Sequence, residues 1–123
     1  MTGPRRQERA ERGAVTAELA LALPLLLAVT VGLVWLLAVG AAQVRVVDSA
    51  REAARAVARG DDQASARSLA LGIAPEGASV DIAIEGGQVT VTSSAEVEGP
   101  GGLFDFMADV VVSARSVALM EQP

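Results

Sequence analysis

The side chain with the clearest chemical consequence is the carboxylate of Glu18, at the start of a long uncharged stretch. Residues 19–44 contain no Asp, Glu, Lys or Arg, and most are Leu, Val or Ala. An ionised group at the rim of such a stretch costs free energy unless it is hydrated or paired with an opposite charge. On its C-terminal side the first basic residue is Arg45, beyond helical reach. Glu18 therefore either lies hydrated among lipid headgroups or pairs with a cation from elsewhere.

The other titratable residues do not form a catalytic set. The chain has no His, Lys, Tyr or Cys, and its glycines match neither a P-loop nor a dinucleotide fingerprint. The adjacent acids Asp61 and Asp62 lack a third carboxylate at calcium-loop spacing, so we interpret them as a helix N-cap. The net charge of −5 opposes binding to nucleic acid. We expect no enzyme activity, no cofactor, no metal, no small-molecule substrate and no nucleic-acid partner.

The uncharged stretch predicts a membrane-spanning helix. A helix of 26 residues, at about 1.5 Å per residue, exceeds the roughly 30 Å hydrocarbon core of a bilayer. Pro24 is tolerated in such a helix and is interpreted as a bend. A cleaved secretory signal is a weaker alternative, because its apolar region has only about 7 to 15 residues and leaves Glu18 unexplained. An uncleaved signal anchor remains open.

The leader, residues 1–13, sets the expected orientation. It contains four arginines and two glutamates, whereas the remainder of the chain is strongly acidic. Basic residues next to a membrane segment stay on the cytoplasmic side. We therefore expect a cytoplasmic N-terminus, a single span in the cell membrane and an extracytoplasmic C-terminal part, which could also lie on a pilus at the cell surface.

The residues around Gly13 resemble the processing region of type IV prepilins. Arg12, Gly13 and Ala14 are followed by Glu18 at the fifth position after the glycine and by Pro24 six residues later. With the basic leader and the immediate apolar stretch, this pattern looks like the TadE-like branch, the minor pilins of tight-adherence pili. The specific match covers about residues 11–54, and the C-terminal part fits more loosely.

This resemblance implies processing and assembly. A prepilin peptidase would cut after Gly13, and Ala14 would become the new N-terminus. Glu18 would then pair with the Ala14 amine of a neighbouring subunit. A terminal amine is cationic below its pKa of about 7.7 to 8.0, so each ion would be the other's best partner in an apolar filament. The implied partners are the peptidase, other pilin subunits, the pilus assembly machinery in the membrane and the lipid bilayer.

The remaining sequence predicts an α+β fold. We expect one long helix over residues 14–59, transmembrane over about 19–42 and then amphipathic, with an apolar stripe that includes Val44, Val47, Ala54 and Val57. A short helix over about 63–71 would bury Ala66, Leu69, Ala70 and Ile73. Residues 60–123 would form one small extracytoplasmic domain.

Strand periodicity predicts a small antiparallel sheet. Residues 79–85 and 88–97 alternate around Gly86 and Gly87 as a hairpin, and residues 110–119 form a third strand. We expect the strand face that carries Val80, Ile82, Ile84, Val89 and Val91 to pack on the amphipathic helix. Phe104 and Phe106 are expected to fill the core.

Two functions follow from the sequence. The first is a structural one, a minor pilin-like subunit processed after Gly13 and assembled through its N-terminal helix. The alternative is an uncleaved single-pass membrane adaptor whose outer domain binds an envelope component.

Overall fold

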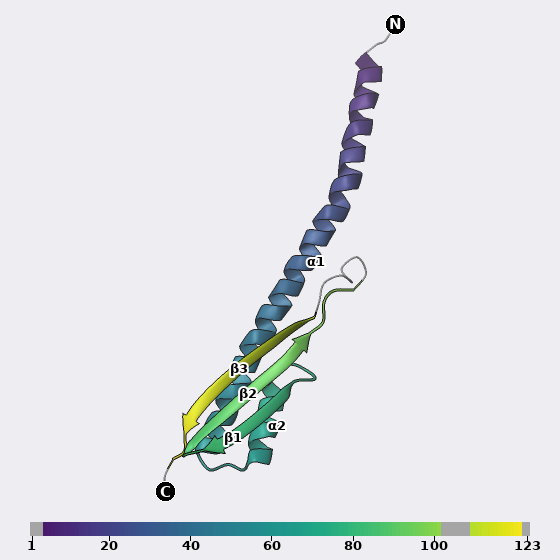
Figure 1. The fold of residues 1–123 in the computed structure, drawn as a ribbon. Helices are drawn as coiled ribbons and strands as arrows, with labels where there is room; N and C mark the ends of the chain where they lie inside the picture. The colour runs from purple at the N-terminus through teal and green to yellow at the C-terminus, as the bar shows by residue number, and fades with distance from the viewer. Residues whose placement is uncertain (1–3, 102–108, 122–123) are drawn as a thin grey trace. The chain divides into compact units, whose positions relative to one another are not determined.

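The computed structural model describes residues 4–101 and 109–121. Their elements follow in the order α1 (Pro4–Ala58), α2 (Gln63–Ile73), β1 (Ser79–Glu85), β2 (Gln88–Val97) and β3 (Val110–Leu119) (Figure 1). The predicted α+β fold, with a long helix, a short helix and three strands, is confirmed. The apolar segment around Phe104 and Phe106 lies outside the described residues. The chain divides into two compact units, Met1–Val34 and Trp35–Pro123, and α1 contributes residues to both.

The helix α1 begins at Pro4, well before the expected start at Ala14. Eight of the thirteen leader residues are Arg, Glu, Gln or Ala, which all have high helix propensity, and proline is favoured in the first helical turn. The helix also continues through Pro24, although a proline has no N–H to donate to the carbonyl four residues earlier. The leader therefore extends the helix instead of preceding it.

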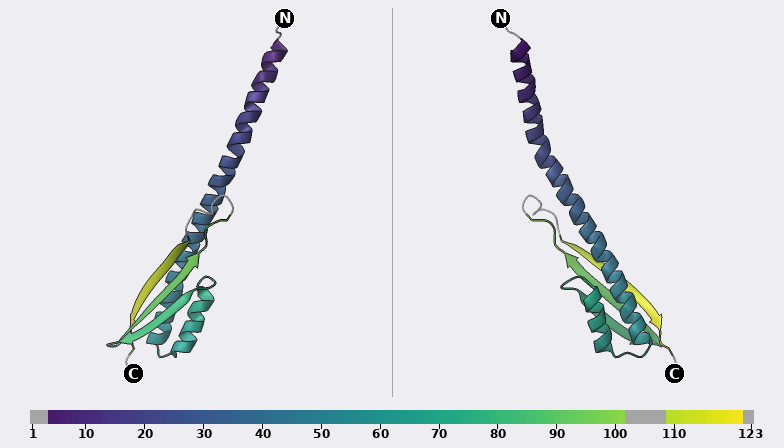
Figure 2. Two further views of the ribbon diagram at one scale, coloured as in Figure 1. Left: turned by 45° about the vertical axis from the view of Figure 1, so that its right-hand side comes forward. Right: turned by 180° about the vertical axis from the view of Figure 1, so that it is seen from behind.

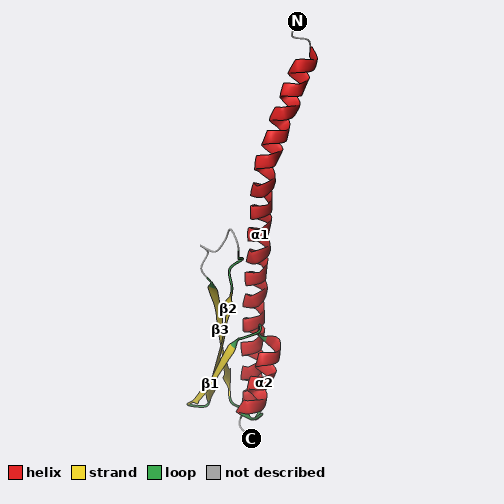
Figure 3. Cartoon of the chain, turned by 90° about the vertical axis from the view of Figure 1, so that its right-hand side faces the viewer, coloured by secondary structure: helices red, strands yellow, loops and turns green. Residues whose placement is uncertain are grey.

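The second unit has two layers. The sheet order is β1-β2-β3 with both neighbours antiparallel, and Figure 3 shows both helices on one side of this sheet. The views in Figure 2 show the same arrangement. Gly86 and Gly87, with φ of +57° and +77°, make the two-residue turn between β1 and β2, a conformation that favours glycine. The hairpin and the third strand have the predicted bounds.

The core of this unit lies between the sheet and the C-terminal half of α1. One cluster joins α1, α2 and the hairpin, and consists of Ala50, Ala53, Ala54, Ala56, Val57, Ala66, Ala70, Val80, Val89 and Val91. A second joins Ala42 and Val46 of α1 to Ala95 and Val112 of the strands. The chain direction of β2 is thus opposite to that of α1. The many alanines allow the helix backbone to approach the sheet closely.

Three side chains expected in the core are exposed instead. Val44 is 60% exposed, Leu69 45% and Ile84 42%. The buried stripe of α1 runs through Ala42, Val46 and Ala50, so Val44 falls on the opposite side of the helix. The predicted stripe was wrong there because it followed the larger valines, whereas small residues face the sheet. Ile82 and Val80 do pack in the core, as expected.

The short helix α2 starts where it was predicted, and Asp62 is its N-cap residue. Its backbone is extended, as a cap requires, yet its side chain makes no capping hydrogen bond. The backbone N–H of Ala66 instead donates to the Asp62 carbonyl at 3.0 Å. Asp62 therefore occupies the predicted N-cap position without a side-chain capping bond, and its carbonyl accepts the first intrahelical bond.

A buried pair of hydroxyls joins the two clusters. Ser49 of α1 and Ser93 of β2 are both fully buried, and their Oγ atoms are 2.7 Å apart. Ser49 Oγ also lies 3.2 Å from the Val46 carbonyl. One hydroxyl has a single proton, so the consistent pattern has Ser93 donating to Ser49 and Ser49 donating to the carbonyl. This hydrogen bond fixes the position of β2 along the axis of α1, because it joins one residue of the helix to one residue of the strand.

Replacing Ser49 with alanine should destabilise the second unit by about 1–3 kcal/mol, because Ser93 keeps a buried hydroxyl with no partner. Ser93→Ala should cost less, since Ser49 keeps its bond to Val46. The double variant should be no less stable than Ser49→Ala alone. Urea unfolding of the detergent-solubilised chain, followed by the fluorescence of Trp35, measures these differences. Ser113→Ala, on the exposed face of β3, is the control, and additive losses in the double variant would contradict the pairing.

Candidate functional site

The predicted site residues all lie on α1 in the first unit. Gly13, Ala14, Glu18 and Pro24 are each exposed in the chain by itself. Among the described residues, neither ion pair involves Glu18: one joins Arg55 to Glu52 and the other joins Arg59 to Asp61. The structure thus leaves the Glu18 carboxylate available for a partner outside the chain.

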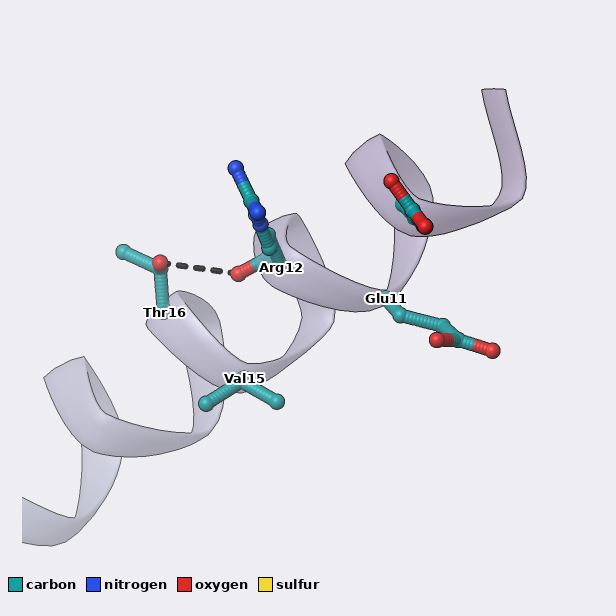
Figure 4. Close-up of a pocket in the computed structure, with 5 residues that line it drawn as sticks. Glu11, Arg12, Val15 and Thr16 are labelled. Atoms are coloured by element: carbon teal, nitrogen blue, oxygen red, sulfur yellow. Dashed lines mark hydrogen bonds between the residues drawn. The ribbon is translucent and has the colours of Figure 1, made fainter. Parts of the chain in front are cut away.

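The Gly13–Ala14 bond lies inside a regular helical turn. The Thr16 hydroxyl donates to the Arg12 carbonyl at 2.8 Å, across this bond (Figure 4). A shallow depression beside it is lined by side chains of this helix alone, namely Glu8, Glu11, Arg12, Val15 and Thr16. Glycine is the weakest helix former after proline, at about 1 kcal/mol relative to alanine. Gly13 is therefore the point at which this part of α1 unwinds most easily.

The apolar side chains that follow Glu18 are not covered by any described part of the chain. The most apolar 18-residue window of α1 has a mean hydropathy of 2.5 and none of it is buried, and α1 is the one described helix long and apolar enough to cross a membrane. In the first unit these side chains are 40–79% exposed: Leu19, Leu21, Leu23, Leu25, Leu26, Leu27, Val29, Val31, Leu33 and Val34. A surface of this kind needs lipid or other helices around it.

A polar cluster was not predicted at the open end of the sheet, by which we mean the end where β2 finishes at Val97 and β3 begins at Val110. The Trp35 indole Nε1 donates to the Glu98 carbonyl at 3.0 Å, just after β2. Asp109, just before β3, accepts from the Gly99 N–H at 3.1 Å. The Gln43 amide donates to the Ser113 carbonyl of β3 at 3.3 Å. Trp35 and Gln43 are side chains with polar hydrogens in an otherwise apolar stretch, and that was the signal for these contacts.

Two carboxylates meet in this cluster. The pKa of Glu96 is raised above its ordinary value by a hydrogen bond with Asp109, and next by the negative charge of Asp109 itself. Partial desolvation and the Glu98 charge act in the same direction. Because folding favours the protonated form, the stability that this contact contributes is present at low pH and is lost as pH rises through the raised pKa. At neutral pH the contact is therefore unfavourable.

We expect Glu96→Gln to raise the melting temperature of the second unit at about pH 7 and to leave it nearly unchanged at about pH 4, where Glu96 is largely protonated. The amide keeps a hydrogen-bond donor for Asp109 without the charge. Thermal unfolding of the detergent-solubilised chain, followed by Trp35 fluorescence, is the measurement. Glu85→Gln, at the end of β1, is the matched control. A gain of equal size at both pH values would argue against the charge repulsion.

One of three comparisons with known proteins finds a match, and it covers the helix that carries Gly13, Ala14, Glu18 and Pro24. Residues 13–55 match the family model described as TadE-like protein. The match begins at Gly13 and ends three residues before the end of α1, so it covers the exposed apolar surface and most of the packed part of the helix. No curated protein and no solved structure matches the chain. The resemblance to the TadE-like family seen in the sequence is confirmed over these residues, and this chain is similar to that family along the helix that carries the candidate site.

Proposed function

We propose that this protein is a minor pilin-like structural subunit of a tight-adherence pilus, processed by a prepilin peptidase after Gly13 and assembled through α1. The observation that carries the proposal is the exposed apolar surface of α1, which coincides with the TadE-like match. A helix with this surface is stable in lipid or against similar helices, and a pilus subunit passes from the first environment to the second. The function is structural.

Membrane insertion gives each part of the chain its place. The arginine-bearing leader lies on the cytoplasmic side and the second unit lies outside the cell. Before assembly the protein is a single-pass protein of the cell membrane. Its partners are the peptidase, the bilayer, the other pilin subunits and the assembly machinery.

Processing requires a local change in α1. A peptidase must reach the carbonyl of Gly13, which in an α-helix accepts the N–H of residue 17. The exposure of Gly13 and Ala14 and the low helix propensity of glycine favour unwinding at this point. Cleavage would remove the charged turns of α1 and leave the apolar turns intact.

Assembly then depends on the new terminus. The Ala14 amine is cationic at neutral pH, and Glu18 is the one acid between it and the apolar stretch. We place the Glu18 carboxylate against the Ala14 amine of a neighbouring subunit. A subunit that docks in the wrong register would leave both charges unpaired in an apolar environment, so this contact selects the stagger between neighbours.

The mature N-terminus is the first test. Mass spectrometry of the membrane-extracted protein should find a chain that begins at Ala14 in cells with a prepilin peptidase and at Met1 in peptidase-deficient cells. A chain that keeps its leader in both strains would support the alternative, an uncleaved membrane adaptor with an extracytoplasmic binding domain. The helical conformation of the Gly13–Ala14 bond is the observation that keeps this alternative open.

The charge pair is tested by Glu18→Ala. Membrane insertion should be unchanged, whereas incorporation into filaments should fall by about tenfold or more, because a lone charge within an apolar helix environment costs about 2.5–3.5 kcal/mol. Quantitative immunoblots of sheared filaments and of membranes give the two values. Glu11→Ala is the matched control, since the leader is removed before assembly. Normal incorporation of the Glu18 variant would eliminate the pairing.

A further inference from the structure

The C-terminal end of the uncharged stretch is already part of the second unit. Val39 and Ala42 pack against side chains of the strands, and Ala42 is 7% exposed. Trp35 is tied to the Glu98 carbonyl by its indole N–H. The sheet therefore lies beside α1 from Trp35 onward, and lipid cannot surround the helix there.

Charged groups lie at the same level. A groove beside residues 38–42 of α1 is lined by the carboxylate-bearing residues Glu76, Glu96 and Glu98 together with Arg45. Each charge placed in hydrocarbon costs several kcal/mol, so this level must be in contact with water or with headgroups. Tryptophan, with its apolar ring and polar N–H, is itself enriched at the membrane interface.

We propose that the open end of the sheet, where β2 ends and β3 begins, rests on the outer headgroup layer of the bilayer, with Trp35 at the boundary. The lipid-embedded part of α1 then ends at Val34. The carboxylates at this end fit zwitterionic phospholipid headgroups, whose outermost group is an ammonium. The inference rests on the proposed function only in requiring that α1 spans the membrane.

The length of the embedded segment follows. Residues 19–34 rise at most about 24 Å, less than the roughly 30 Å hydrocarbon core. Residues 14–34 rise about 31 Å and match it. With Trp35 at the outer boundary, either the bilayer thins around α1 or Glu18 is drawn below the inner headgroups. A span over residues 19–42 would instead place Trp35 about 10 Å inside the outer boundary.

The test uses Trp35, the one tryptophan of the chain, as its own depth probe. The full chain is reconstituted in phosphatidylcholine vesicles whose acyl chains are brominated either near the headgroup or near the chain end. The shallow bromines should quench Trp35 at least about twofold more strongly than the deep ones, as expected for an interfacial residue. Stronger quenching by the deep bromines would overturn the proposal.

Two variants separate this inference from the membrane insertion on which it rests. In a Trp35→Phe background, Leu26→Trp should be quenched mainly by the deep bromines and Val44→Trp by neither; both native residues are 60% exposed, so each position has room for the larger side chain. If the deep bromines quench Leu26→Trp while no bromine quenches Trp35 in the native chain, the outer membrane boundary lies closer to the N-terminus than Trp35. The boundary proposal then fails, whereas membrane insertion of α1 stands. If no position is quenched, α1 is not in the bilayer and both fail.

Discussion

The structure depends on one constraint: the first half of α1 has an apolar surface that the described chain does not cover. Every large apolar side chain among residues 4–34 is substantially exposed, and no strand or second helix in the described residues belongs to this unit. Burial of such side chains is worth about 25 cal/mol per Å² of apolar surface, so a partner is required. In the proposed function, lipid is this partner before assembly and neighbouring subunits are the partner afterwards. The proposal assigns to Glu18, at the rim of this surface, the role of setting the register of that packing.

The second unit depends on α1 in a different way. Its sheet has three strands, and the fully buried side chains in the described part of the unit are no larger than valine. Such a sheet is stable only with a helix packed on one face. The alanine stripe of α1 allows a close approach, and the bond between Ser49 and Ser93 fixes its height. The C-terminal part of α1 thus covers one face of a small domain, whereas its N-terminal part has an apolar surface that other molecules must cover.

Much of this could be predicted from the sequence, and the errors have a common cause. Charge, length and period predicted the long helix, the hairpin around Gly86 and Gly87 and the third strand, because these patterns act locally. The burial of Val44, Leu69 and Ile84 was predicted wrongly. Tertiary packing decides which side of an element faces its neighbour, and in α1 the buried side consists mainly of alanines. The contact of Trp35 with Glu98 joins residues 63 positions apart, and no local pattern reports it. The roles of Gly13, Ala14, Glu18 and Pro24 stay predictions, because no ion pair of Glu18 is present among the described residues.

The most direct test of the account is a zero-length cross-link in assembled filaments. The chain has no lysine, so after processing the Ala14 amine is its one primary amine, and an apolar carbodiimide can join it only to a carboxylate in direct contact. Within one helix Glu18 is also four residues from Ala14, so the product must be assigned by mass spectrometry to one chain or two. The account predicts a bond between the Ala14 amine and a carboxylate of a neighbouring subunit, and likewise between Glu18 and a neighbour's terminus. Cross-links confined to single chains, in filaments whose termini are processed, would contradict it.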